Sequence, residues 1–66
     1  MNKYDWKNVP KWVNFIATDP NGIAYGYEKR PYIILNSMFV GGNYVNIGSS
    51  SCNVYWKNSV EERPNV

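Results

Sequence analysis

The sequence contains no histidine and only one cysteine, and these two scarcities exclude several kinds of site. With Cys52 alone, no internal disulfide can form. Without histidine, a mixed Cys/His zinc site is excluded as well. A lone thiol is compatible with a reducing compartment. We therefore expect no disulfide, metal or cofactor in this protein.

Strong charge and long apolar segments are also missing. Seven basic and five acidic side chains give a formal net charge of +2, which is too weak to indicate nucleic-acid binding through charge alone. The longest apolar run covers residues 32–35, far short of the roughly 20 residues that span a membrane. No basic amino-terminal region precedes a hydrophobic run. The expectation is a soluble, intracellular protein without a membrane partner.

Aromatic side chains, in contrast, are abundant and make up 17% of the 66 residues. A chain of this length buries only about 60% of the surface that its unfolded form exposes, so its core is thin. Large rings bury much area per residue, and a short chain without disulfide or metal depends on them or on a partner subunit. We predict one small domain over residues 1–66, assembled as a homo-oligomer.

Alternating side chains and a turn predict a hairpin over residues 12–30. Residues 12–18 read as a strand because rings or aliphatic side chains occur on both of its faces. Residues 19–22, Asp-Pro-Asn-Gly, have the composition of a β-turn. On the returning strand, Tyr25 and Tyr27 share one face, while the small Ala24 and Gly26 on the other permit close approach.

The rest of the chain predicts more short strands and two single helical turns. Further strands are expected at residues 32–35, 38–40, 44–47 and 53–56, with a loop at 48–51. Asp5 is expected to cap a turn that ends at Val9, and Ser59 with Glu62 has the spacing of a capping box. The predicted fold is all-β: a small antiparallel sheet of about five strands, curled or barrel-like.

Residues of reactive types do not combine into a catalytic set. Cys52 follows three serines, but no histidine exists to act as its base. The adjacent side chains of Glu61 and Glu62 diverge on a helix or a strand, so they do not form an acid/base pair. Asp19 is more simply a turn residue. We predict no catalytic residue and no enzyme.

Binding candidates are aromatic and basic residues, for which three uses stay open. Tryptophan and tyrosine dominate protein interfaces, although packing is the simpler role for Trp56. Tyrosines also stack on nucleobases while cations hold phosphate. Rings on a strand can bind single-stranded nucleic acid, but Glu28 lies where a cation is wanted. The candidate binding residues are Trp12, Tyr25, Tyr27, Lys29, Arg30, Trp56 and Lys57.

The two ends of the chain carry a more specific pattern. It consists of Asp-Trp-x-x-x-Pro at residues 5–10, Asp-x-x-Gly at 19–22 and Trp-x-x-Ser-hydrophobic-Glu-x-Arg-Pro at 56–64. In this pattern the chain resembles a set of small bacteriophage and prophage proteins, with Val60 in place of their more common leucine. The resemblance implies a phage origin. It brings no established active site, so no catalytic residue is transferred.

Phage proteins of this size often act on the host by binding, for example to a defence protein or a signalling nucleotide, an analogy at the level of the class. The leading hypothesis is therefore a non-enzymatic protein that binds and inhibits a host factor in the bacterial cytoplasm. A sponge that sequesters a nucleotide signalling molecule is the first alternative. A single-stranded nucleic-acid-binding module is the second, and nucleic acid is the less expected ligand.

Overall fold

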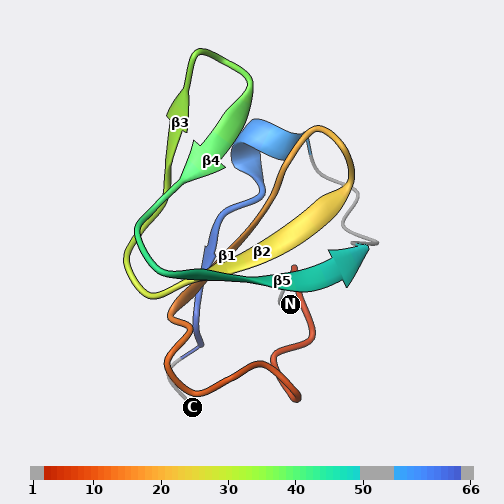
Figure 1. Cartoon of the computed structure of the whole chain (residues 1–66). Helices are drawn as coiled ribbons and strands as arrows, with labels where there is room; N and C mark the ends of the chain where they lie inside the picture. Colours follow the sequence, from red (N-terminus) through yellow and green to blue (C-terminus); the bar gives the residue numbers. More distant parts are fainter. Residues whose placement is uncertain (1–2, 50–54, 65–66) are drawn as a thin grey trace.

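The computed structural model describes residues 3–49 and 55–64, and over these residues the predicted all-β architecture is confirmed. A single short 3₁₀ helix, η1, accompanies the strands in the described part of the chain. The elements follow in the order β1 (Phe15–Thr18), β2 (Ile23–Tyr27), β3 (Tyr32–Ile34), β4 (Met38–Val40), β5 (Tyr44–Ser49), η1 (Trp56–Asn58) and β6 (Glu61–Glu62) (Figure 1).

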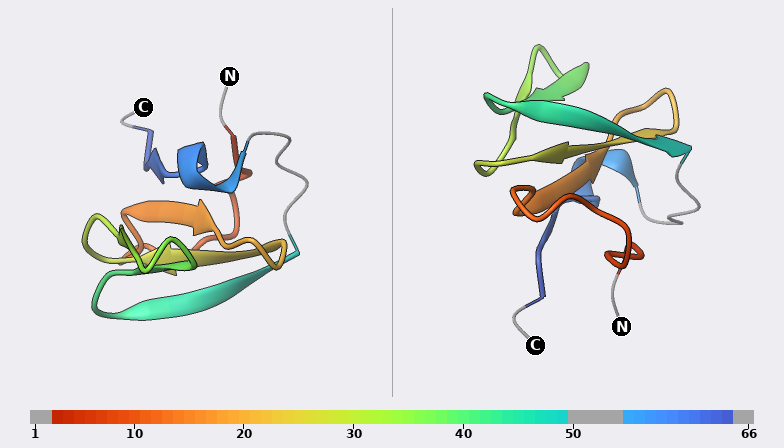
Figure 2. Two further views of the ribbon diagram at one scale, coloured as in Figure 1. Left: turned by 90° about the horizontal axis from the view of Figure 1, so that it is seen from above. Right: turned by 60° about the horizontal axis from the view of Figure 1, so that its bottom comes forward.

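The strands form a four-stranded sheet in the order β5-β2-β1-β6 and a separate two-stranded sheet, β3-β4. All pairs are antiparallel. β5 pairs with β2, so the β3–β4 hairpin is an excursion between two neighbouring strands of the larger sheet. Figure 2 shows this hairpin on one side of the larger sheet and the amino-terminal segment on the other.

The turn between β1 and β2 forms where it was predicted. The amide of Gly22 donates to the carbonyl of Asp19 at 2.9 Å, and Gly22 has a φ of +87°, which favours glycine. The side chain of Asn21 accepts the amide of Ile23 at 2.9 Å. The hairpin register then pairs Phe15 with Tyr27.

The first strand, however, is shorter than predicted, because it begins at Phe15 and not at residue 12. Val13 donates its amide to the carbonyl of Pro10 at 3.1 Å, so the chain turns before the strand begins. As a result, Val13 packs with Ile16, whereas Phe15 packs on the opposite face of the sheet. The alternation of a strand does not extend back to Val13.

Each face of the larger sheet carries its own small core. On one face, the buried Val13, Ile16 and Ala24 pack against partly buried side chains of the amino-terminal segment and β5: Tyr4, Trp6, Val9, Val45 and Ile47. On the other, the buried Ala17, Tyr27 and Phe39 pack against Phe15, Tyr25, Ile33, Trp56 and Val60. The β3–β4 hairpin and η1 thus cover one face, and the amino-terminal segment covers the other.

Gly26 lies where the turn before β1 approaches β2 closely. A Cβ atom added at Gly26 would lie 2.7 Å from Cγ1 and 3.0 Å from Cγ2 of Val13, which is fully buried. The predicted close approach on this face of β2 is therefore confirmed. The absence of a side chain at Gly26 lets the turn before β1 lie directly on β2.

The two ends of the chain are joined by a terminal clasp, which we define as Tyr4, Trp6, Ser59, Glu61 and Arg63. The indole Nε1 of Trp6 donates to Glu61 Oε1 at 2.7 Å, and the Arg63 guanidinium lies 4.9 Å from the centre of the Trp6 ring. Arg63 also donates from Nε to the carbonyl of Val13 at 2.8 Å. The clasp therefore holds the carboxyl-terminal segment against the amino-terminal one.

Ser59 forms the buried end of the terminal clasp. Its hydroxyl oxygen accepts the amide of Thr18 at 2.8 Å and lies 2.6 Å from the carbonyl of Trp56, to which it donates. The phenol of Tyr4 donates to the carbonyl of Ser59 at 2.9 Å. Most of the terminal pattern is thus used in holding the fold together.

A turn forms in the amino-terminal segment where one was predicted, with Asp5 at its start, but it is a hydrogen-bonded turn and not the expected helical one. Val9 donates its amide to the carbonyl of Trp6 at 3.3 Å, and a carboxylate oxygen of Asp5 accepts the amide of Lys7 at 2.9 Å. Asp5 therefore satisfies a free amide at the start of the turn, which is the role of a cap.

Three local predictions near the carboxyl terminus are wrong. The strand expected at residues 53–56 does not include its last two residues, because Tyr55 is not in a strand and Trp56 begins η1. A helical turn does not begin at Ser59, because Glu61–Glu62 pair with β1 as β6. Ser59 instead ends η1, donating its amide to Trp56 at 3.1 Å. The loop expected at 48–51 does not include its first two residues, since Gly48 and Ser49 belong to β5. Residues 50–51 and 53–54 lie outside the described residues.

Candidate functional site

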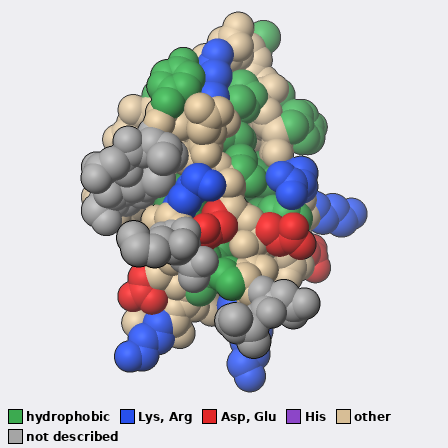
Figure 3. All heavy atoms as spheres, turned by 180° about the vertical axis from the view of Figure 1, so that it is seen from behind, with side chains coloured by type: hydrophobic (Ala, Val, Ile, Leu, Met, Phe, Trp, Pro, Cys, Tyr) green, Lys and Arg blue, Asp and Glu red, His purple; other side chains and the backbone are tan. Residues whose placement is uncertain are grey.

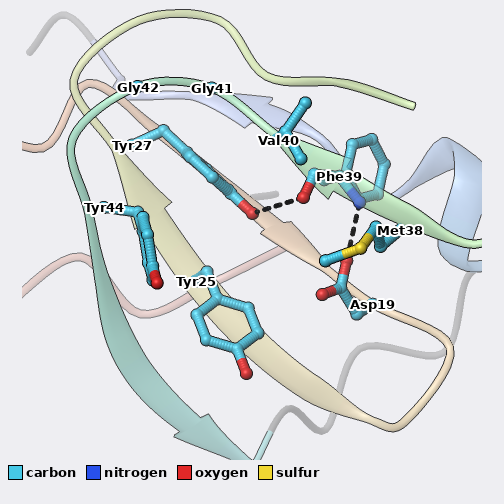
Figure 4. Close-up of a pocket in the computed structure, with 9 residues that line it drawn as sticks. All are labelled: Asp19, Tyr25, Tyr27, Met38, Phe39, Val40, Gly41, Gly42 and Tyr44. Carbon is cyan, nitrogen blue, oxygen red and sulfur yellow. Dashed lines mark hydrogen bonds between the residues drawn. The ribbon is translucent and has the colours of Figure 1, made fainter. Parts of the chain in front are cut away.

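An open hollow lies where the β3–β4 hairpin meets the tyrosine-bearing face of β2 and β5 (Figure 4). Its volume is about 310 Å³, at the lower end of the range typical of small-molecule sites. We call it the tyrosine hollow and define it by its lining residues: Asp19, Tyr25, Tyr27, Met38, Phe39, Val40, Gly41, Gly42 and Tyr44.

Three tyrosine rings form one side of the tyrosine hollow because of the register of β2 and β5. Tyr25 and Tyr27 are two residues apart on β2, and Tyr44 pairs with Tyr27 across the strands. The rings of Tyr25 and Tyr44 meet edge to face, with centroids 6.0 Å apart and planes at 76°. The rings of Tyr27 and Tyr44 are 6.4 Å apart at 39°. Tyr27 is buried, whereas Tyr44 is 66% exposed at the rim.

Asp19 closes the opposite side of the hollow and also fixes the hairpin above it. One of its carboxylate oxygens accepts the amide of Phe39 at 3.0 Å, which ties β4 to the turn after β1. In Figure 4 the other oxygen points toward the space between Asp19 and the tyrosines. Asp19 is 9% exposed, so its charge acts within a largely desolvated surrounding.

The phenol of Tyr27 stays neutral in this environment. Burial is the main cause that raises the pKa of Tyr27 well above its ordinary range, and the negative charge of Asp19 raises it further. The hydroxyl donates to the carbonyl of Phe39 at 3.5 Å. The inner wall of the hollow is therefore an uncharged phenol beside a carboxylate.

Two of the seven predicted binding residues, Tyr25 and Tyr27, meet in the tyrosine hollow, and Trp12 lies beside it. Trp12, which is 42% exposed, lines a neighbouring hollow together with Glu28, Asn43 and Tyr44. Because Tyr44 lines both hollows, the two hollows adjoin, and three exposed apolar side chains border them. We call these side chains the exposed apolar strip: Met38, Tyr44 and Trp12.

The predicted basic residues lie elsewhere. The Arg30 guanidinium sits 4.8 Å from the centre of the Phe15 ring and 3.8 Å from Glu62. Lys29 is exposed just after β2 and does not line the tyrosine hollow. No lysine or arginine is among the residues that line this hollow in the described part of the chain.

Trp56 and Lys57 support the hairpin from η1. Trp56 packs edge to face on Phe39, with ring centroids 5.6 Å apart. Lys57 lies 5.7 Å from the centre of the Trp56 ring and donates from Nζ to the side-chain oxygen of Asn36 at 3.0 Å. These contacts hold the β3–β4 hairpin in place over the sheet.

Potential metal-ligating side chains do not cluster in the described part of the chain. Within residues 3–49 and 55–64, no three His, Cys, Asp or Glu side chains gather closely enough to hold a metal ion. Glu61 bonds within the terminal clasp while Glu62 is exposed, so the two carboxylates serve different neighbours. Cys52 lies outside the described residues.

Charges of both signs are mixed over the surface. Figure 3, a view from behind, shows basic and acidic side chains interspersed, and the described residues on this face form no continuous basic patch. A basic patch is the electrostatic footprint of nucleic-acid binding. Among the described helices, none has the length and apolarity needed to cross a membrane.

Sequence reasoning missed most of the site, including Asp19, Met38 and Tyr44. Tyr44 was placed on a strand, but only the pairing of β5 with β2 brings it beside Tyr25 and Tyr27. Met38 begins β4 and reaches the hollow because Asp19 and Trp56 hold that hairpin over β2. The two-residue spacing of Tyr25 and Tyr27 is the only sequence feature that points to this site, and it identifies one side of the tyrosine hollow.

Comparison with known proteins gives no match: no family model, no curated protein and no solved structure is significantly similar to this chain.

Proposed function

We propose that this protein is a non-enzymatic, phage-encoded binding protein that inhibits a host factor, a bacterial defence protein, in the host cytoplasm. The observation that carries this proposal is the exposed apolar strip around the tyrosine hollow, in which Met38 is 43% and Tyr44 66% exposed. Tyrosine and methionine are enriched at protein interfaces, and exposed rings are a frequent source of binding energy.

The β3–β4 hairpin adds a second exposed apolar element beside this strip. Tyr32 is 64% exposed, and Leu35 is 90% exposed in the turn at the tip of the hairpin. Leu35 also adopts a positive φ of 51°, a region that costs a leucine roughly 1–2 kcal/mol. A strained, exposed leucine supports a role in contact with a partner, since folding alone does not favour it.

The experiment is affinity capture from host cells with the wild type and two matched variants. Tyr44→Ala removes an exposed ring from the strip, and Lys7→Ala changes an exposed side chain in the amino-terminal turn, on the other face of the sheet. We expect a host protein retained by the wild type and by Lys7→Ala to be lost with Tyr44→Ala. Equal retention by all three would contradict the proposal.

Assembly into a homo-oligomer is part of the same proposal. β5 is an edge strand of six residues, and its sequence carries no charged side chain of the kind that protects exposed edges. Two copies of β5 can pair edge to edge as antiparallel strands. Sedimentation should show a dimer or larger species that Asn46→Lys shifts toward monomer. A wild type that is monomeric at every concentration would exclude this assembly.

A nucleotide sponge is the alternative that the three tyrosines favour, because rings stack on bases. The lining of the tyrosine hollow, with Asp19 and no described lysine or arginine, offers no counter-charge for a phosphate. A thermal-shift panel of cyclic and linear nucleotides tests it, since a ligand that binds the folded state raises its melting temperature.

Single-stranded nucleic acid is the second alternative. Trp12, Tyr25 and Tyr27 line two adjoining hollows, but each hollow also has an acidic residue in its lining, Glu28 in one and Asp19 in the other. This alternative requires salt-dependent binding to an oligonucleotide that Tyr25→Ala with Tyr27→Ala abolishes.

A further inference from the structure

The tyrosine hollow carries negative charge and no positive charge among its described lining residues. Asp19 supplies the only carboxylate among its described lining residues, and lysine and arginine are absent from that lining. Asp19 as a whole residue is 9% exposed, so water screens its field less than at an open surface. An anion entering here meets repulsion, whereas a cation is attracted.

The tyrosine rings add to the same preference. The faces of aromatic rings are negative, and a cation within about 6 Å of a ring centre is attracted to them. Tyr25 and Tyr44 stand nearly perpendicular, at 76°, so a ring face of one and an edge of the other border the same space. In Figure 4 the three tyrosines and the Asp19 carboxylate surround that space from different sides.

The phenol of Tyr27 does not oppose this arrangement. Its hydrogen is directed to the carbonyl of Phe39, so the lone pairs of its oxygen remain able to accept from a donor. A phenol is neutral at pH 7, and burial raises the pKa of Tyr27 further. An ammonium or guanidinium group carries several N–H donors and no acceptor, which matches a wall of phenol and carboxylate oxygens.

We propose that the tyrosine hollow binds the basic head group of a lysine or arginine side chain presented by the partner protein. The rim suits the stem of such a side chain, because Met38 and Val40 offer apolar surface to its methylene groups. This inference rests on the proposed function and specifies what the partner must present: an exposed basic residue.

The test is an NMR titration of the full chain at constant ionic strength, following the ring signals of Tyr25, Tyr27 and Tyr44. The two probes are Nα-acetyl-lysine N-methylamide and its neutral analogue Nα-acetyl-norleucine N-methylamide, which differ in the charged head group. Each ring–cation contact is worth a factor of roughly two to thirty in affinity. We expect the lysine probe to bind at least several-fold more tightly than the norleucine probe.

Two variants assign this preference to its source. Asp19→Asn removes the charge but keeps a side-chain oxygen that can accept the amide of Phe39, so the hairpin stays anchored. With Asp19→Asn, the lysine and norleucine probes should bind with nearly equal affinity. Tyr44→Phe keeps the ring and should retain the preference, whereas Tyr44→Ala should weaken it.

Equal binding of the two probes to the wild type would overturn the inference, as would tighter binding of inorganic phosphate at the same rings. This failure is distinct from a failure of the proposed function. If Tyr44→Ala no longer captures the host protein while the lysine and norleucine probes bind equally, the proposed function is supported and the cation preference is refuted. If the lysine probe binds more tightly but Tyr44→Ala still captures the host protein, the cation preference is supported and the proposed function is refuted.

Discussion

Val13 and Gly26 show how a single hydrogen atom in place of a side chain decides the packing of a thin core. The fully buried Val13 occupies the space that a Cβ at position 26 would need, at 2.7 Å. Gly26→Ala should therefore lower the free energy of unfolding by roughly 1–3 kcal/mol, the usual cost of overpacking. Urea unfolding measures this change.

The control for this prediction is a double-mutant cycle. Val13→Ala removes the two Cγ atoms that the new methyl group would meet. In the Val13→Ala background, Gly26→Ala should cost much less than in the wild type, since contacting residues couple. Additive effects of the two substitutions would show that the close approach is not the cause.

Tyr27 makes stability depend on pH in the alkaline range. The pKa of its phenol is raised above the ordinary 10.0, chiefly by burial and then by the charge of Asp19. In the unfolded chain the phenol loses its proton near 10.0, whereas in the folded chain it keeps it, so rising pH favours unfolding. This contribution is complete below pH 10 and is lost as the pH rises further.

The corresponding measurement is the free energy of unfolding at pH values from 8 to 11.5. The wild type should lose stability above about pH 10, and Tyr27→Phe should show a shallower slope because it has no proton to lose. The same slope in both proteins would exclude Tyr27 as the source.

At the scale of elements, the β3–β4 hairpin carries local strain at its turn. Leu35 and Asn36 have φ values of 51° and 53°, and asparagine tolerates this region better than leucine. Because Leu35 is 90% exposed, Leu35→Asn should raise the free energy of unfolding by roughly 0.5–1 kcal/mol without loss of packing. Urea unfolding measures the gain.

The same variant separates stability from binding. If the hairpin tip contacts the partner, Leu35→Asn should retain less of the captured host protein although it is more stable, which is the expected trade-off at a functional site. Asn36→Gly is the matched control, because it keeps Leu35, adopts a positive φ without strain and removes the oxygen that Lys57 binds. A Leu35→Asn variant less stable than the wild type would contradict the claim that Leu35 is strained.

Local elements were predictable where short-range chemistry determines them. The Asp-Pro-Asn-Gly turn and the cap at Asp5 depend on neighbouring residues only, and both predictions are confirmed. The start of β1 was not predictable from alternation, because the turn from Pro10 to Val13 and the packing on Gly26 override it. The β6 pairing depends on the terminal clasp, which joins residues more than 50 positions apart.

On the scale of the whole molecule, the terminal clasp links the two ends of the chain across the sheet. The hydrogen bond from Trp6 Nε1 to Glu61 Oε1 is partly buried and ends on a charged oxygen. Trp6→Phe keeps an aromatic ring in place and removes the donor, so it should lower the free energy of unfolding by roughly 1–2 kcal/mol.

Thermal or urea unfolding of Trp6→Phe, alone and combined with Glu61→Gln, tests this contribution. The second substitution should cost little once the donor is gone, because the two side chains act as a pair. Full additivity would argue that Trp6 stabilises the fold through its ring alone. Neither variant should affect capture of the host protein if the clasp is structural.

Only part of the candidate site could be predicted from the sequence, because contacts between distant segments form the rest. Tyr25 and Tyr27 share a face by the period of a strand, but Tyr44, Met38 and Asp19 join them through pairing and hairpin placement between distant segments. The predicted cations Lys29, Arg30 and Lys57 stay outside the tyrosine hollow, and this separation gives the hollow its negative character.

The most direct test is amide hydrogen exchange of this protein, measured with and without the captured host protein bound. Binding at the tyrosine hollow should slow amide exchange in β4, in the Gly41–Gly42 segment and at the start of β5, while the amides of the terminal clasp stay unchanged. Protection centred on the terminal clasp, with the residues of the hollow unaffected, would contradict it.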